Sequence, residues 1–381
     1  MRKFLDKLEP MFAKGGKYEK LYPLFEAAQT FFYTVNYTTV RPSHIRDAVN
    51  LKRVIILVYL AAVPAMIFGW YFVGAQHYAA AGEGGGLFSN LWYGAMVHIP
   101  LYIIVFAVAI FWEVLFSVVR RHEISEGVFV TALLYSLILP PTIPIWQACL
   151  GISFGIVIGK EIFGGTGKNF VNPALAGRAF LYFAYPAQMS GEVWVDLDGI
   201  TKTVDGFSGA TPLAKFVEQG INADVSWWGA FFGNVGGSIG EVSTFAILIG
   251  AAIVIATGVA SWRIMVGVLG GAIGTSLFLT CFQSETNLML TVPFWWHLVI
   301  GGFAFGTVFM ATDPITASVT NLGRYIYGAL IGVMTILIRV VNPAFPEGIM
   351  LAILFANVFA PLIDYFVQVA NVKRRKVRTN G

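Results

Sequence analysis

Charged residues are scarce in this sequence. Only 12% of its 381 residues are Asp, Glu, Lys or Arg, whereas 57% are hydrophobic. A soluble globular domain carries about twice that charged fraction, because its surface must be hydrated. The scarcity of charge therefore excludes a soluble fold, and a mean hydropathy of +0.71 indicates that much of the surface faces lipid.

Cysteine is nearly absent, and several common cofactor motifs are missing. Cys149 and Cys281 are too few for a disulfide framework or for a cysteine-ligated cluster. Neither a dinucleotide-binding glycine motif nor a P-loop occurs. The histidines show no metal-ligand spacing, so we expect them to be structural or interfacial: His44, His77, His98, His122 and His297.

Long apolar runs are abundant instead. They predict an all-α integral membrane protein of about ten transmembrane helices, and the 41 glycines suit close helix packing in lipid. Several runs are short and broken by Gly or Pro, which is typical of discontinuous helices. The runs are 54–73, 100–119, 128–139, 145–157, 173–186, 242–260, 264–282, 294–310, 325–338 and 349–367.

The basic residues predict the orientation. Residues 1–53 form a basic, amphipathic segment that we expect at the cytoplasmic membrane surface, and residues 371–381 form a basic cytoplasmic tail. Residues 188–241 carry seven acids against two lysines, so the positive-inside rule places this loop outside and both termini inside. The acids are Glu192, Asp196, Asp198, Asp205, Glu218, Asp224 and Glu241.

An internal repeat divides the chain. The string Val-Asn-Pro-Ala occurs at 171–174 and again at 341–344, each time ahead of an apolar run and behind a Pro-containing break. A chance match of four residues is the alternative. A true repeat predicts two halves, 54–187 and 242–370, of about five helices each and of opposite topology, with ion or ligand sites at the broken helices.

Thr211 lies among small residues in the predicted outer loop, in the string Asp-Gly-Phe-Ser-Gly-Ala-Thr at 205–211. Asp205, Ser208, Gly209 and Ala210 leave the threonine hydroxyl open to a bulky group. An ordinary turn with a solvated threonine has the same local composition.

Further motifs, together with this one, carry a resemblance to a known family. They are Ser-His-Ile-Arg-Asp at 43–47, Phe-Trp-Glu-Val-Leu-Phe at 111–116, the glycine-rich tract 163–173, and Phe-Met-Ala-Thr-Asp-Pro at 309–314. Over essentially its full length the chain resembles the B subunits of the sodium-translocating NADH:ubiquinone oxidoreductases, and it is related to the D subunits of the Rnf complexes. The basic N-terminal segment favours the former.

The resemblance implies cofactors and partners. Thr211 would carry covalent FMN through a phosphoester, and a second flavin, riboflavin, would bind without a covalent bond in the membrane domain. Ubiquinone would be the electron acceptor, Na⁺ the exported ion, and the location the bacterial inner membrane. NADH would be oxidised on another subunit, and a further FMN-bearing subunit would lie at the outer face.

Asn169 and Asn172 are the residues that we expect to bind riboflavin. An asparagine amide offers both a donor and an acceptor, which suits the edge of an isoalloxazine ring. The structural alternative is that both residues cap a helix that begins at Pro173.

Three acids lie in or beside apolar runs, where each costs about 3 kcal/mol to insert. Asp313, Glu113 and Asp364 are candidates for the sodium path, because Na⁺ prefers oxygen ligands. The alternative is structural pairing with Arg178 or Arg339. Phe305 and Phe309, one turn apart, are candidates for a hydrophobic gate, with lipid-facing packing as the alternative.

Inverted repeats and broken helices alone also fit a different function. A channel or carrier for a small solute, without any redox role, would show the same pattern. Such a protein would be colourless when purified, whereas a flavin-bearing subunit would be yellow.

Overall fold

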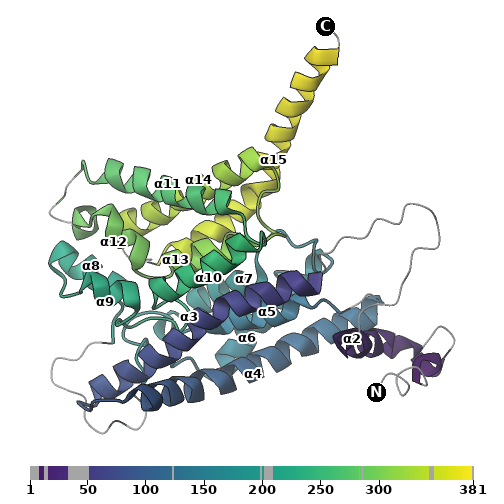
Figure 1. Ribbon diagram of the computed structural model, residues 1–381, viewed down its shortest axis with the longest axis horizontal. Coiled ribbons are helices and arrows are strands. Elements are labelled where there is room, and N and C mark those ends of the chain that lie inside the picture. The colour runs from purple at the N-terminus through teal and green to yellow at the C-terminus, as the bar shows by residue number, and fades with distance from the viewer. Residues whose placement is uncertain are drawn as a thin grey trace.

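The computed structural model describes residues 8–12, 16–32, 51–121, 124–197, 200, 209–282, 284, 287–342 and 347–379. This part of the chain is helical and contains no β-strand. Figure 1 shows the long helices packed side by side.

Six of the described helices are long and apolar enough to cross a membrane. They cover Arg53–Ala80, Leu87–Arg120, Ile145–Phe163, Trp262–Leu279, Asn321–Val341 and Ile349–Arg378. Two shorter apolar helices, Gly127–Leu137 and Thr244–Ala256, accompany them. The described chain is therefore that of a multi-pass membrane protein.

The first two long helices form a hairpin. Helix α3 (Leu51–Ala80) packs along α4 (Leu87–Arg120), and each contains a proline in its interior, Pro64 and Pro100. The sequence-based start of the second span at Pro100 is wrong, because α4 begins 13 residues earlier, at Leu87. Helices in lipid tolerate an internal proline where neighbouring helices and side chains satisfy the freed carbonyl.

The next helices are short and interrupted, as the apolar runs predict. Helix α5 (Gly127–Leu137) ends before the proline-rich stretch 140–144, and α6 (Ile145–Val157) follows it. The end of α5 is capped from far along the chain: Gly240 N donates to Leu137 O at 2.8 Å, and Ser238 Oγ donates to Ile138 O at 3.1 Å. A buried helix end needs such partners, because no water reaches it.

A second interrupted segment lies between residues 294 and 310. Helix α12 (Phe294–Val299) ends two residues before Gly301, whose φ of +63° favours glycine. Helix α13 (Phe303–Phe305) then leads into a π-helical turn, η6 (Gly306–Met310). Arg339 caps α12 by donating to the carbonyl oxygens of His297 at 2.8 Å and Ile300 at 3.1 Å. π-helical turns are frequent at functional sites.

The remaining elements complete the bundle. Helix α11 (Trp262–Leu279) packs closely along α14 (Asn321–Val341), and α15 (Ile349–Thr379) packs on α14 and continues through the basic tail. The other elements are η1 (Glu19–Leu21), α2 (Tyr22–Phe32), η2 (Glu161–Phe163), α7 (Pro173–Ala184), η3 (Pro186–Gln188), α8 (Pro212–Gln219), η4 (Gly220–Asn222), α9 (Trp227–Phe232), α10 (Thr244–Ala256) and η5 (Leu288–Thr291).

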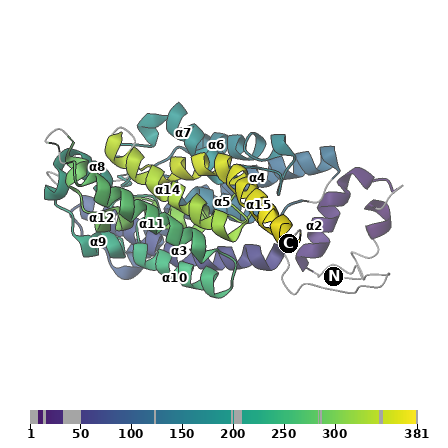
Figure 2. The ribbon, with the colours of Figure 1, turned by 90° about the horizontal axis from the view of Figure 1, so that it is seen from above.

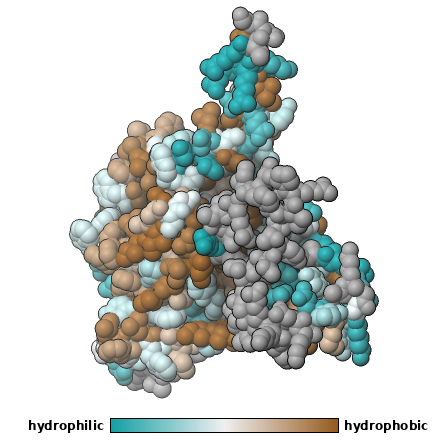
Figure 3. All heavy atoms as spheres, turned by 45° about the vertical axis from the view of Figure 1, so that its right-hand side comes forward, coloured by the Kyte–Doolittle hydropathy of each residue, from teal (hydrophilic) through white to brown (hydrophobic). Residues whose placement is uncertain are grey.

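The two ends of the molecule differ. In Figure 2, α2 and the C-terminal end of α15 lie toward one end, whereas α8, α9 and α12 lie toward the opposite end. Figure 3 shows brown, hydrophobic side chains over much of the visible body and teal, hydrophilic ones on the protruding end of α15. The visible body of the bundle thus exposes an apolar surface next to the hydrophilic end of α15, as expected of a protein that crosses a membrane.

Candidate functional site

A cavity of about 150 Å³ lies between the two halves of the chain. Its wall is mostly apolar and comes from α3, α5, α10, the segment that leads into α7, and the residues around η6. Polar side chains from the two halves meet in this wall: Thr131, Lys160, Thr166, Asn169, Asn172, Thr312 and Asp313. Both riboflavin candidates, the sodium candidate Asp313 and the gate candidate Phe309 therefore line one space.

Asn172 has two roles in this wall. Its Oδ1 accepts hydrogen bonds from Ala174 N at 3.0 Å and Leu175 N at 3.3 Å, so it caps α7, with Pro173 at the first helical position. Its Nδ2 donates to Asp313 Oδ2 at 3.4 Å. The capping that the sequence offers as an alternative is confirmed for Asn172, and the residue also faces the cavity.

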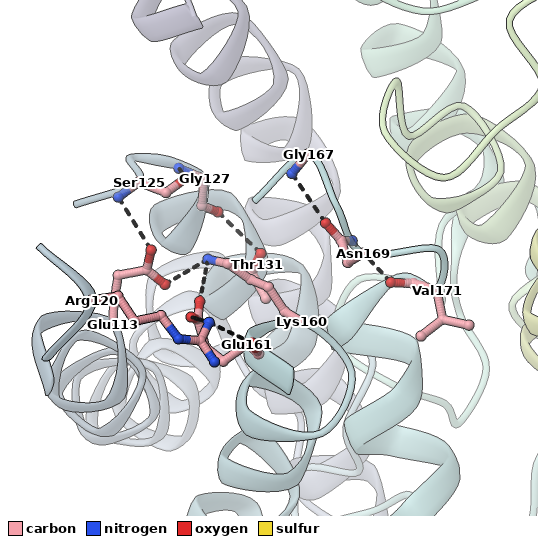
Figure 4. Close-up of polar contacts among 10 residues, drawn as sticks. All are labelled: Glu113, Arg120, Ser125, Gly127, Thr131, Lys160, Glu161, Gly167, Asn169 and Val171. Atoms are coloured by element: carbon pink, nitrogen blue, oxygen red, sulfur yellow. Dashed lines mark hydrogen bonds and ion pairs between the residues drawn. The ribbon is translucent and has the colours of Figure 1, made fainter. Parts of the chain in front are cut away.

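Asn169 does not cap the helix. Figure 4 shows its amide within its own loop, where Gly167 N donates to Oδ1 at 3.3 Å and Nδ2 donates to Val171 O at 3.0 Å. The nearby hydroxyl oxygen of Thr166 is buried in the cavity wall and has no hydrogen-bond partner among the described residues. A buried hydroxyl without a partner is costly, so a polar group in the cavity would satisfy it.

Asp313 lies beside the π-helical turn. Its carboxylate accepts from Thr316 Oγ1 at 2.9 Å, Ile315 N at 3.2 Å and Asn172 Nδ2 at 3.4 Å. None of the ion pairs among the described residues involves it, so the Arg178 or Arg339 pairing considered from the sequence is not observed. Its three donors are neutral, which leaves its charge without a cationic partner in the described part of the chain.

Glu113 has a cationic partner, although a different one from those considered. Its Oε2 lies 2.5 Å from Lys160 Nζ, and its Oε1 accepts from Ser125 N at 3.2 Å. Figure 4 shows Lys160 between Glu113 and Glu161, with Arg120 on the far side of Glu161. Glu113, Lys160 and Glu161 are buried, whereas Arg120 is exposed at the edge of the network. Lys160 also lines the cavity.

Asp364 anchors the start of α14. From its position on α15 it accepts hydrogen bonds from Ser318 Oγ at 2.7 Å, Val319 N at 2.8 Å, and Thr320 N and Oγ1 at 3.0 and 2.6 Å. It forms no ion pair with a described residue, so the arginine pairing considered from the sequence is not observed here either. Four donors satisfy this carboxylate, which gives it a clear structural role.

Phe305 and Phe309 pack against each other within the protein, with their rings tilted by 50°. Their ring centroids are 5.0 Å apart, and both side chains are buried. Phe305 packs close to Gly240 and Phe309 close to Gly250, so neither ring faces lipid as the packing alternative held.

Thr211 lies at the opposite end of the molecule from α2, at the start of α8. It is the N-cap residue of α8: its Oγ1 accepts from Ala214 N at 3.3 Å, and Pro212 follows at the first helical position. The side chain is partly exposed, and Gly209 before it packs against the Glu192 backbone. Asp205 and Ser208 lie outside the described residues.

A buried charge cluster joins the two halves, and sequence reasoning did not find it. Arg178 of α7 donates to Glu241 Oε1 at 2.9 Å and to Glu347 Oε2 at 2.5 Å. Burial raises the pKa of the Glu347 carboxyl above its usual range, although Arg178 favours its ionised form. Glu241 therefore belongs to the interior and not to the solvated outer loop in which its position in the sequence placed it.

The geometry defines a polytopic α-helical membrane protein with a polar-lined cavity at its broken helices. Comparison with known proteins narrows this class. Residues 38–373 match the model of the NQR2, RnfD, RnfE family, and the chain belongs to that family.

Similar proteins match the chain from end to end. The B subunit of the Na(+)-translocating NADH-quinone reductase of Neisseria meningitidis serogroup A is 53% identical over 414 aligned residues, which cover all of both chains. The B subunits of the same reductase from Chromohalobacter salexigens and Klebsiella pneumoniae are 55% and 54% identical, over 99% of this chain and 96% and 99% of their own.

Proposed function

We propose that this chain is the membrane subunit of a sodium-pumping NADH:ubiquinone reductase. It would carry electrons from covalent FMN by way of riboflavin to ubiquinone, coupled to Na⁺ export. The similarity to the B subunits over the full length is the observation that carries this proposal. The flavins supply the electron transfer, and the chain supplies their positions and surroundings.

Thr211 is the residue that would hold the FMN. Its hydroxyl is partly exposed at the start of a helix, where a phosphate linked to it would lie near the positive end of α8. Gly209 and Ala210 before it are small, so a bulky group meets no side chain larger than a methyl group there. Asp205 and Ser208 belong to the same proposed attachment motif.

The cavity around Asn172 would hold the riboflavin. A flavin ring needs an apolar space with a few hydrogen-bonding groups at its edge, and this cavity has that character. Asn172 and Asn169 supply amide groups, while the Thr166 hydroxyl, which has no partner among the described residues, supplies a donor. The residues present therefore fit the group.

The sodium path would pass the same region. Asp313 is the strongest candidate for a cation ligand, because the described groups around its charge are neutral donors. Glu113 and Asp364 remain candidates along the path, each with the structural partners described above. Phe305 and Phe309, buried beside the cavity, would form the hydrophobic gate.

We further propose ten membrane-crossing segments in two inverted repeats, 54–187 and 242–370. Each of the ten apolar runs coincides with a helix or with a group of short helices. The halves also pack alike: α4 packs on α6 and α6 on α7, while α11 packs on α14 and α14 on α15. These likenesses support an inverted repeat.

The orientation would place both termini in the cytoplasm of a bacterium and the flavin-bearing segment 188–241, except for its buried last residue Glu241, outside the inner membrane. The position of α2 and the α15 tail at one end, opposite α8, supports this assignment. Residues 1–53 and 371–381 would then face the cytoplasm, where NADH is oxidised on another subunit. An FMN-bearing subunit would meet the outer face.

Substitution of Thr211 tests the covalent attachment. In the whole complex, Thr211→Ala should abolish the flavin fluorescence that remains with this chain after denaturing electrophoresis. Ser243→Ala is the matched control, because Ser243 caps α10 through the same 3.3 Å contact, and each variant loses a cap worth about 1 kcal/mol. Fluorescence that persists in Thr211→Ala would contradict the proposal.

A further inference from the structure

A second, polar cavity lies beside Thr211. It measures about 250 Å³ and is open to the surface at the end of the molecule where α8 and α9 lie. Ala210 and Pro212, the residues on either side of Thr211, form part of its wall, and Lys215 forms another part. Lys215 N donates to Thr211 O at 3.1 Å, so the lysine stands one helical turn after the threonine.

The polar groups of this cavity come from three separate segments. Gln76 comes from the end of α3, and Asp224, Ser226 and Asn234 come from the segments around α9. Gln76 Nε2 donates to Asn234 Oδ1 at 3.2 Å, and this hydrogen bond joins the end of α3 to the segment that follows α9. The cavity is therefore built by the tertiary fold and not by one loop.

The donors and acceptors suit one kind of ligand. Lys215 is partly buried and makes no ion pair with any described residue, so its ammonium group is available to an anion. Amides, a hydroxyl and a carboxylate can exchange hydrogen bonds with the hydroxyl groups of a polyol. A phosphate linked to a chain of hydroxyl groups matches this set, whereas a flat apolar ring does not.

We propose that this cavity holds the phosphoribityl chain of the flavin on Thr211, with the Lys215 ammonium group paired to the phosphodiester. The inference rests on the proposed function, because it takes the flavin on Thr211 as given. Asp224, Ser226 and Asn234 bind the ribityl hydroxyls. The isoalloxazine ring then stays outside the cavity, at the surface, where a neighbouring subunit can exchange electrons with it.

Flavin mobility in the whole complex tests the proposal. In Lys215→Gln, loss of one charge-assisted hydrogen bond should lower the ratio of docked to undocked flavin about tenfold. Time-resolved fluorescence anisotropy of the covalent flavin measures this ratio as the fraction that rotates freely. Asn234→Asp, which keeps the Oδ1 contact with Gln76 but removes the Nδ2 donor to the ribityl hydroxyls, should act in the same direction.

Two controls separate charge from folding. Lys215→Arg keeps the charge, and Glu218→Gln changes one charge on an exposed residue of α8 that does not line the cavity. Both should keep the flavin immobile. Riboflavin content, which depends on a distant cavity, reports whether each variant is folded.

The outcomes are distinguishable. Immobile flavin in both Lys215→Gln and Asn234→Asp would overturn the cavity assignment while leaving the flavin on Thr211. Loss of covalent flavin from both Lys215→Gln and Lys215→Arg, with riboflavin retained, would also overturn it, because the charge would then be irrelevant. Absence of covalent flavin from the wild-type chain would overturn the proposed function itself.

Discussion

At the scale of single residues, Glu113 and Lys160 show how charge is held inside the helical core. Both side chains are almost fully buried, and together with Glu161 and Arg120 they form a network of two acids and two bases. An isolated charge at this depth would be very unfavourable. Mutual attraction offsets this cost only while both partners remain.

A double-mutant cycle tests this pairing. Lys160→Met should lower the free energy of unfolding by about 3–5 kcal/mol, because it leaves the Glu113 carboxylate buried without its cation. The double variant Glu113→Gln/Lys160→Met should lose less than the sum of the two single variants. Thermal unfolding of the purified chain in detergent measures each value, and additive losses would contradict the pairing.

Two substitutions of Asn172 test its helix-capping role and its proposed ligand-binding role separately. Serine caps a helix nearly as well as asparagine, but it carries a hydroxyl and no side-chain amide. Asn172→Ser should therefore keep the wild-type melting temperature and lose riboflavin, whereas Asn172→Ala should lose riboflavin and about 1 kcal/mol of stability.

Chromatography of the acid-extracted flavins measures the riboflavin. Asn287→Ala is the control, because Asn287 also caps a short helix, η5, but lies outside the cavity. Full riboflavin content in Asn172→Ser would show that the amide does not contact the ligand.

At the scale of elements, the contact between α11 and α14 depends on glycine. A Cβ atom added at Gly332 would overlap the Val268 carbonyl oxygen, and one at Gly328 would overlap the Ile264 carbonyl oxygen. The two backbones thus approach each other as closely as small residues permit, which is a common way for helices to associate in lipid.

Substitutions at two glycines test this contact. Gly332→Ala should destabilise the protein by about 1–3 kcal/mol, because the helices must separate to admit a methyl group. Gly270→Ala, on the exposed side of α11 with no atom within 4 Å of the added group, is the control and should be neutral. Equal melting temperatures for the two variants would contradict this packing.

The sequence predicted the order of the helices much better than it predicted the contacts between their side chains. Apolar runs and prolines located the helices, because lipid forces the backbone to satisfy itself locally. The length of α4 was missed, since Pro100 is tolerated within it. Lys160 as the partner of Glu113, and Glu241 and Glu347 as partners of Arg178, could not be found, because these pairs depend on contacts between residues far apart in the chain.

For the candidate site, too, the sequence predicted individual residues but not the contacts between them. The motif at 163–173 indicated Asn169 and Asn172, and the motif at 309–314 indicated Phe309 and Asp313, but only the fold shows that these residues line one cavity. Thr166 carried no signal of its own. Its significance comes from a buried hydroxyl that lacks a partner among the described residues, which only the packing reveals.

At the scale of the whole molecule, the basic end with α2 and the α15 tail lies opposite the end with α8. Labelling of single cysteines in right-side-out spheroplasts tests the proposed orientation, after replacement of Cys149 and Cys281 by serine. Asn222→Cys, on exposed η4, should react with an impermeant maleimide, whereas Lys376→Cys should react only after permeabilisation. The reverse pattern would invert the proposed topology.

The mass of one peptide tests the central claim most directly. Trypsin should release residues 203–215, which contain Thr211, from this chain of the assembled complex. We expect the peptide to be heavier than its amino acids by FMN less one water, with the added mass on Thr211 in fragmentation spectra. A peptide with only the mass of its amino acids would contradict the account.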